Sequence, residues 1–94
     1  MADTVSVIPK GEQRGGQEVY IIEVSRDGTN RSLEKTRLEM GDIVRRENLR
    51  IQRLRLQREE AVKDGQPVAA IDAEIATTVD LSQDATTVYE FMPR

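Results

Sequence analysis

The longest stretch of helical periodicity, residues 32–63, carries apolar residues on two opposite sides. At about 100° per residue, eight apolar side chains fall within an arc of about 100°: Leu33, Met40, Ile43, Val44, Ile51, Leu54, Ala61 and Val62. On the opposite side, Leu38, Leu49 and Leu56 lie within about 20° of one another, and Leu49 and Leu56 are one heptad apart. One neighbouring helix covers only one of these faces, so the chain needs more than a single helical partner.

The predicted helix over residues 32–63 has recognisable ends. Ser32 can cap the first turn, and the stretch Asp64-Gly65-Gln66-Pro67 combines a helix stop with a proline suited to the start of another helix. Gly41 predicts a kink, or a break at which Asp42 caps a second piece. We favour one kinked helix.

A second helix is predicted over residues 67–81, which place four apolar side chains on one side: Val68, Ile71, Ile75 and Val79. The short connection between the two helices favours an antiparallel, coiled-coil-like αα-hairpin.

Short β-strands are predicted near both ends of the chain. Residues 18–25 are β-branched and aromatic and end at an Asp-Gly turn, and residues 86–91 are again β-favouring. Residues 1–17 are polar and contain Pro9 and three glycines, so we expect an extended arm. The predicted fold class is mainly α with minor β: the arm, followed by one small domain over residues 18–94.

The residue types present exclude several kinds of site. The chain has neither cysteine nor histidine, so disulfides and nucleophilic Ser-His or Cys-His pairs are ruled out, as are most metal sites. Glu59 and Glu60 are adjacent on an exposed helix and do not face one pocket. We therefore predict no enzyme, no cofactor and no metal. A core this small usually needs reinforcement, and association with another protein is the remaining route.

The sequence has no run approaching the roughly 18 apolar residues that span a bilayer, and its N-terminus does not resemble a signal peptide. We therefore expect cytoplasmic synthesis and no membrane.

Charge is unevenly distributed along the chain. Residues 32–63 hold nine basic and six acidic residues, whereas the rest holds five basic and eleven acidic ones. The basic segment could contact nucleic acid, or the acidic segments of one copy could fold onto the basic segment of another. Six arginines in residues 45–60 project around nearly the whole helix. Only Arg46, Arg50 and Arg53 share one face, which is the possible contact for a polyanion. The net charge of −3 and the lack of nearby aromatic residues make nucleic acid the weaker alternative.

Two charged residues, Glu47 and Arg58, fall inside the main apolar arc, where an unpaired charge is unfavourable. We expect both to meet partners from another helix and to help set its register. With the three leucines, they form the predicted partner interface: Leu38, Leu49, Leu56, Glu47 and Arg58. The alternative is that the leucines are ordinary exposed residues of a surface.

These patterns favour a non-enzymatic structural or assembly protein that contributes a helical hairpin and extended ends to a homo- or hetero-oligomer. Small size and the arm-plus-helix organisation suggest a bacteriophage virion as its setting. Two alternatives stay open: a nucleic-acid-associated regulator that uses the arginine-rich helix, and a cytoplasmic adaptor or chaperone-like hairpin that clasps a partner helix.

Overall fold

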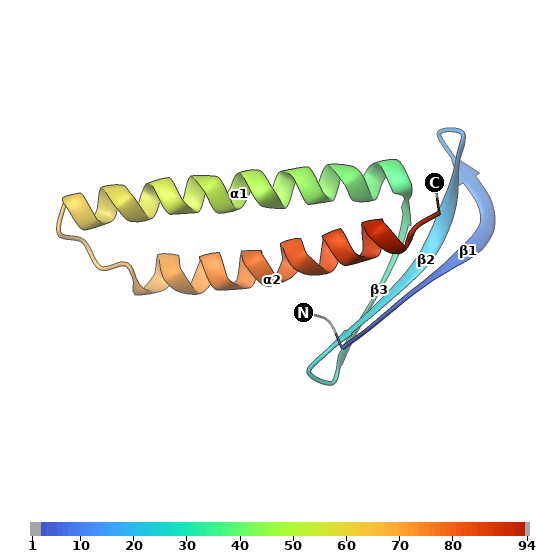
Figure 1. The fold of residues 1–94 in the computed structure, drawn as a ribbon, viewed down its shortest axis with the longest axis horizontal. Helices are drawn as coiled ribbons and strands as arrows, with labels where there is room; N and C mark the ends of the chain where they lie inside the picture. The colour runs from blue at the N-terminus through green and yellow to red at the C-terminus, as the bar shows by residue number, and fades with distance from the viewer. Residues whose placement is uncertain (1–2, 94) are drawn as a thin grey trace.

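The computed structural model describes residues 3–93, which form a three-stranded antiparallel sheet followed by two antiparallel helices (Figure 1). The sheet has the order β1 (Thr4–Arg14), β2 (Gln17–Arg26), β3 (Thr29–Thr36), and the helices are α1 (Arg37–Lys63) and α2 (Ala69–Phe91). One end of the helical pair lies against the sheet and the other extends away from it, so the molecule measures 53 × 30 × 15 Å.

The predicted class, mainly α with minor β, is therefore wrong. The described part of residues 1–17 is not an extended arm, because Thr4–Arg14 pairs with β2. The start of the predicted helix over residues 32–63 belongs to β3, which pairs with the other side of β2. Residues 86–91 are not a strand but the last turns of α2. In each case contacts with distant parts of the chain override the local pattern.

The strands are joined by two-residue turns whose backbone matches their residues. Arg14 pairs with Gln17 and Arg26 pairs with Thr29, which leaves Gly15-Gly16 and Asp27-Gly28 as the connecting pairs. All four connecting residues have positive φ values, between 50° and 79°. Hairpin turns of this kind need positive φ at both central positions, which glycine and aspartate tolerate.

The core lies between one face of the sheet and the sheet end of the helices. Tyr20, Ile22 and Val24 alternate along β2 and face the helices, so the central strand supplies the middle of the core. Helix α2 contributes Ala85 and Val88, the residue that follows its end contributes Met92, and α1 contributes Met40. Ile22 is 0% exposed, and Met40 and Val88 are each 1% exposed. This packing explains why residues 86–91 are helical in spite of their β-favouring composition.

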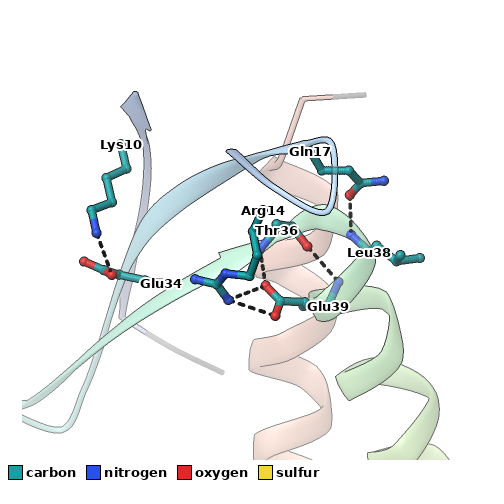
Figure 2. A network of polar contacts seen from close by, with 7 residues as sticks. All are labelled: Lys10, Arg14, Gln17, Glu34, Thr36, Leu38 and Glu39. Atoms are coloured by element: carbon teal, nitrogen blue, oxygen red, sulfur yellow. Dashed lines mark hydrogen bonds and ion pairs between the residues drawn. The ribbon is translucent and has the colours of Figure 1, made fainter. Parts of the chain in front are cut away.

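Helix α1 begins at a capping box rather than at Ser32, which lies in β3. The Thr36 side chain accepts a hydrogen bond from the Glu39 amide at 3.2 Å, and the Thr36 amide donates to the Glu39 carboxylate at 2.8 Å. Arg14 donates two further bonds to the same carboxylate, at 2.8 and 2.9 Å, from the end of β1 (Figure 2). Gln17 accepts a bond from the Leu38 amide at 3.2 Å. These bonds fix the corner between the sheet and α1.

Gly41 does not break α1, which is one helix from Arg37 to Lys63. A Cβ atom at this position would lie 3.1 Å from Cε1 of the Tyr89 ring. Glycine therefore lets the aromatic ring of α2 pack directly against the backbone of α1. The Arg37 guanidinium covers the same ring at 4.1 Å from its centre, as a cation–π contact.

The Glu39 contacts predict a pH-dependent contribution to stability. The amide of Thr36, followed by Arg14, lowers the pKa of Glu39 below its usual value of about 4.3. A carboxylate with a lowered pKa in the folded state stabilises the fold above its unfolded pKa, and this stabilisation is lost as the pH falls through the folded pKa. We expect Glu39→Gln to be less stable than wild type in urea denaturation at pH 7, with the difference shrinking below about pH 4.

Glu90 provides the matched control for this measurement, because it is exposed and makes no ion pair with the residues that the structure describes. Glu90→Gln should match wild type across the same pH range. A Glu39→Gln deficit that is equal at pH 7 and pH 3 would show that the charge of Glu39 is not what stabilises the corner.

Candidate protein-interaction surface on helix α1

The side of α1 that faces α2 holds most of the residues of the predicted main arc. Met40, Ile51 and Leu54 are buried, and Ile43, Val44 and Ala61 are partly buried. Val62 is 55% exposed near the end of the helix, and Leu33 lies in β3. Beyond the sheet, this face packs against α2, where Thr78 is buried and Ser82 donates a hydrogen bond to Asn48 at 2.8 Å.

The opposite side of α1 carries Leu38, Leu49 and Leu56, which we call the outer stripe. Their exposed fractions are 60%, 52% and 60%. Because each lies on the side of the helix that points away from α2, the hairpin cannot cover them. The structure thus brings the three predicted leucines onto one exposed surface, and a partner on that surface stays a prediction.

The two predicted charged interface residues lie elsewhere. The Arg58 Nε donates a hydrogen bond at 2.6 Å to Asp72 of α2, and this bond raises the pKa of Arg58. Arg58 thus meets a second helix, but that helix belongs to the same chain. Glu47 is partly buried beside an apolar cavity of about 150 Å³ between sheet and helices, and its Oε2 has no hydrogen-bond partner among the described residues. Both residues lie on the inner side of the hairpin, away from the outer stripe.

The uneven charge of the sequence is partly balanced within the chain. Helix α2 contains five acidic residues and no basic one, and it runs beside the arginine-rich α1. Arg50 donates a hydrogen bond to Glu74 at 2.7 Å, which raises the pKa of Arg50. Of the three arginines predicted to share a polyanion face, only Arg46 and Arg53 are therefore without an ion pair in the described part of the chain.

The outer stripe is bordered by charged residues that the sequence interpretation did not assign to the interface. Between Leu38 and Leu49 lie Asp42, Arg45 and Arg46, of which the first two form an ion pair. Toward the tip lie Glu59, Glu60 and Lys63, for which the structure shows no ion pair within residues 3–93. The sequence contained an indication of this border, because charged residues lie three or four positions from each leucine of the outer stripe.

The sequence interpretation also missed a partly buried ion pair between the sheet and α2. Arg26 at the end of β2 donates two hydrogen bonds to Asp84 of α2, at 3.1 and 2.6 Å, and these bonds raise the pKa of Arg26. The predicted second helix ends at residue 81 and therefore leaves Asp84 outside it. Only the extension of α2 beyond residue 81 places its carboxylate next to Ala85 and Val88, on the face that meets the sheet.

The described residues form neither a metal site nor a membrane-spanning helix. Residues 3–93 hold no group of three or more carboxylates placed to bind a metal ion. Neither of the described helices has the length and apolar character needed to cross a membrane. A surface depression of about 490 Å³ is lined by Arg37 and Tyr89, but these two side chains already contact each other.

Comparison with protein-family models, with curated protein sequences and with solved structures gives no match for this chain, so its surface is interpreted from its own residues and geometry.

Proposed function

We propose that this chain is a non-enzymatic assembly protein that joins a protein oligomer through the outer stripe of α1. The exposure of Leu38, Leu49 and Leu56 along one face of the longest helix supports this proposal most directly. Burial of a leucine side chain contributes about 1.5–3 kcal/mol. A partner that covers the stripe would thus contribute an energy comparable to a large part of a small domain's stability.

The elongated shape also supports the proposal. The part of the hairpin beyond the sheet is two helices thick, and its inner contact rests on a few side chains such as Ile51 and Leu54. Two-helix layers are seldom stable alone, because each helix keeps one side in water. A third or fourth helix against α1 would complete a bundle around this segment.

The decisive experiment is sedimentation of the purified chain with Leu49→Asp and Leu56→Asp combined. Wild type is expected to sediment as a species heavier than the 10.6 kDa chain. The double variant is expected to be monomeric, because two carboxylates in the contact would lose their hydration without a partner. Both leucines are exposed in the single chain, so the helical circular dichroism signal per residue should be retained.

Val62→Asp is the control, since Val62 is an exposed aliphatic residue of α1 outside the outer stripe. Its sedimentation should follow that of wild type. A wild-type chain that is a stable monomer with the same Tm as the double variant would contradict the proposal.

The alternatives receive less support from the geometry. The polyanion face is reduced by the pairing of Arg50 with Glu74, so we do not carry the nucleic-acid regulator forward. A clasping adaptor would use the inner faces of the hairpin, which here contact each other. We retain cytoplasmic synthesis but do not extend the proposal to a virion, because most of the predicted arm, one of the features that suggested that setting, is strand β1.

A further inference from the structure

We infer that the partner of the outer stripe is a second copy of this chain, whose α1 lies antiparallel to the first about a twofold axis passing between Gln52 and Arg53. This inference rests on the proposed function and names its partner. In this register, Leu49 lies level with Leu56 of the second copy, and Leu56 lies level with Leu49. The two exposed leucines of each chain therefore cover those of the other.

The charged residues beside the stripe select this arrangement. Segment 42–46 holds Asp42, Arg45 and Arg46 and has a net charge of +1, whereas segment 59–63 holds Glu59, Glu60 and Lys63 and has a net charge of −1. The proposed axis places segment 42–46 of each chain beside segment 59–63 of the other. Both ends of the contact are then neutral.

Individual pairs also meet on the correct sides of the helix. About the axis of α1, Arg45 and Glu59 lie on one side of the stripe, and Arg46 and Glu60 lie on the other. A twofold axis perpendicular to two antiparallel helices places each side of the stripe next to the same side of the stripe in the second copy. Arg45 thus faces Glu59 of the second copy and Arg46 faces its Glu60, each within about 1.5 Å along the helix. Flanking charges of this kind set orientation in coiled coils.

These side chains are available for the contact. Arg46, Glu59 and Glu60 make no ion pair with any residue that the structure describes. Arg45 is held only by Asp42, and both side chains are more than half exposed, at 66% and 58%. Exposed pairs of this type contribute about 0.2–1 kcal/mol. Replacing Asp42 by a glutamate of the second copy as the partner of Arg45 therefore costs little free energy.

A parallel arrangement is disfavoured by the same residues. It would place Arg45 and Arg46 against their own copies at one end, and Glu59 and Glu60 against theirs at the other.

The antiparallel arrangement keeps one like-charge contact, between the two Arg53 side chains beside the axis. Arg53→Gln should therefore tighten association several-fold. Leu38 lies beyond the paired length, because α1 of the second copy ends at Lys63, level with Asp42, so Leu38→Ala should change association less than Leu49→Ala.

The test uses two charge variants that should pair only with each other. Arg45→Glu with Arg46→Glu makes both border segments acidic, and Glu59→Arg with Glu60→Arg makes both basic. Each variant alone should self-associate at least about tenfold more weakly than wild type, since four favourable pairs become repulsive. An equimolar mixture should associate as tightly as wild type, because every border segment then meets its opposite. Equal association of each variant alone and of wild type would overturn the inference.

Orientation is measured with single cysteines, because the chain contains none. Under mild oxidation, a mixture of Leu49→Cys and Leu56→Cys should form the mixed disulfide in preference to either symmetric one. Preferred symmetric disulfides would show a parallel pair and overturn the inference.

The two proposals fail in different ways. Association that depends on Leu49 and Leu56 but ignores the charge variants overturns the antiparallel copy and leaves the assembly function standing. A chain that is monomeric in every form overturns both.

The association of the mixed variants should also weaken as salt is raised, because its attraction comes from exposed charges.

Discussion

Ile22→Ala is expected to lower the free energy of unfolding by about 2–5 kcal/mol, the range for removing a large buried aliphatic side chain. Ile22 is 0% exposed and lies at the middle of the central strand. Its side chain faces the residues of α1 and α2 that close the core, including Met40 and Val88. The cavity left by alanine would be bordered by both layers, so neither layer can fill it without moving the other.

Urea denaturation followed by circular dichroism measures this loss. Ile8→Ala is the matched control, because it removes the same side-chain atoms from β1 at a position where isoleucine is 54% exposed. Its effect should stay within about 0.5 kcal/mol. Equal losses for the two variants would mean that the helix-facing side of the sheet is not the main core.

Asp84→Ala is expected to have the second-largest effect, a loss of about 1.5–3 kcal/mol, typical of hydrogen bonds to charged groups. The Asp84 side chain is 11% exposed and accepts two hydrogen bonds from Arg26, whose side chain is 26% exposed. Alanine would leave the guanidinium partly buried without its main partner, which is less favourable than never burying the charge. It would also release α2 from the end of β2.

Asp80→Ala is the control, because Asp80 lies one helical turn away and approaches the same arginine at 3.9 Å while 53% exposed. Its loss in thermal or urea denaturation should be below about 1 kcal/mol, as for exposed ion pairs. If Asp80→Ala destabilised the chain as much as Asp84→Ala, the short bonds to Asp84 would not be the link between sheet and helix.

The sequence predicted the elements whose local pattern agrees with their surroundings. Residues 18–25 are rich in apolar and β-branched side chains because the strand is central, and this pattern was sufficient to identify it. The stop at residues 64–67 was sufficient to separate the two helices. Both signals are local, so no knowledge of the rest of the chain was needed.

The missed elements depend on contacts that are distant in sequence. Strand β1 contains Pro9 and several polar residues, and it is a strand because β2 offers it a partner. Strand β3 has one apolar core residue, Leu33, and Ser32 resembled a helix cap although the cap is Thr36. In α2, the β-favouring run ending at Phe91 is helical because Val88 and Met92 then reach the sheet.

The shared exposed side of the leucines was easier to predict than the fold. Leu49 and Leu56 share a face in any helix, wherever that helix begins, so the shift of its start from residue 32 to residue 37 left their positions unchanged. Arg58 was more difficult, since its partner Asp72 is identified only when the register between α1 and α2 is known.

The pairing irregularity in β1 bears on how the chain avoids uncontrolled polymerisation. The register against β2 shifts between Pro9 and Gln13, and Pro9 has no amide hydrogen to donate. This strand is one open edge of the sheet, and open edges invite strands from other molecules. The proline and the shift interrupt the regular row of backbone donors and acceptors that a foreign strand would need. The β1 edge is therefore a poor template for the regular pairing of a further strand.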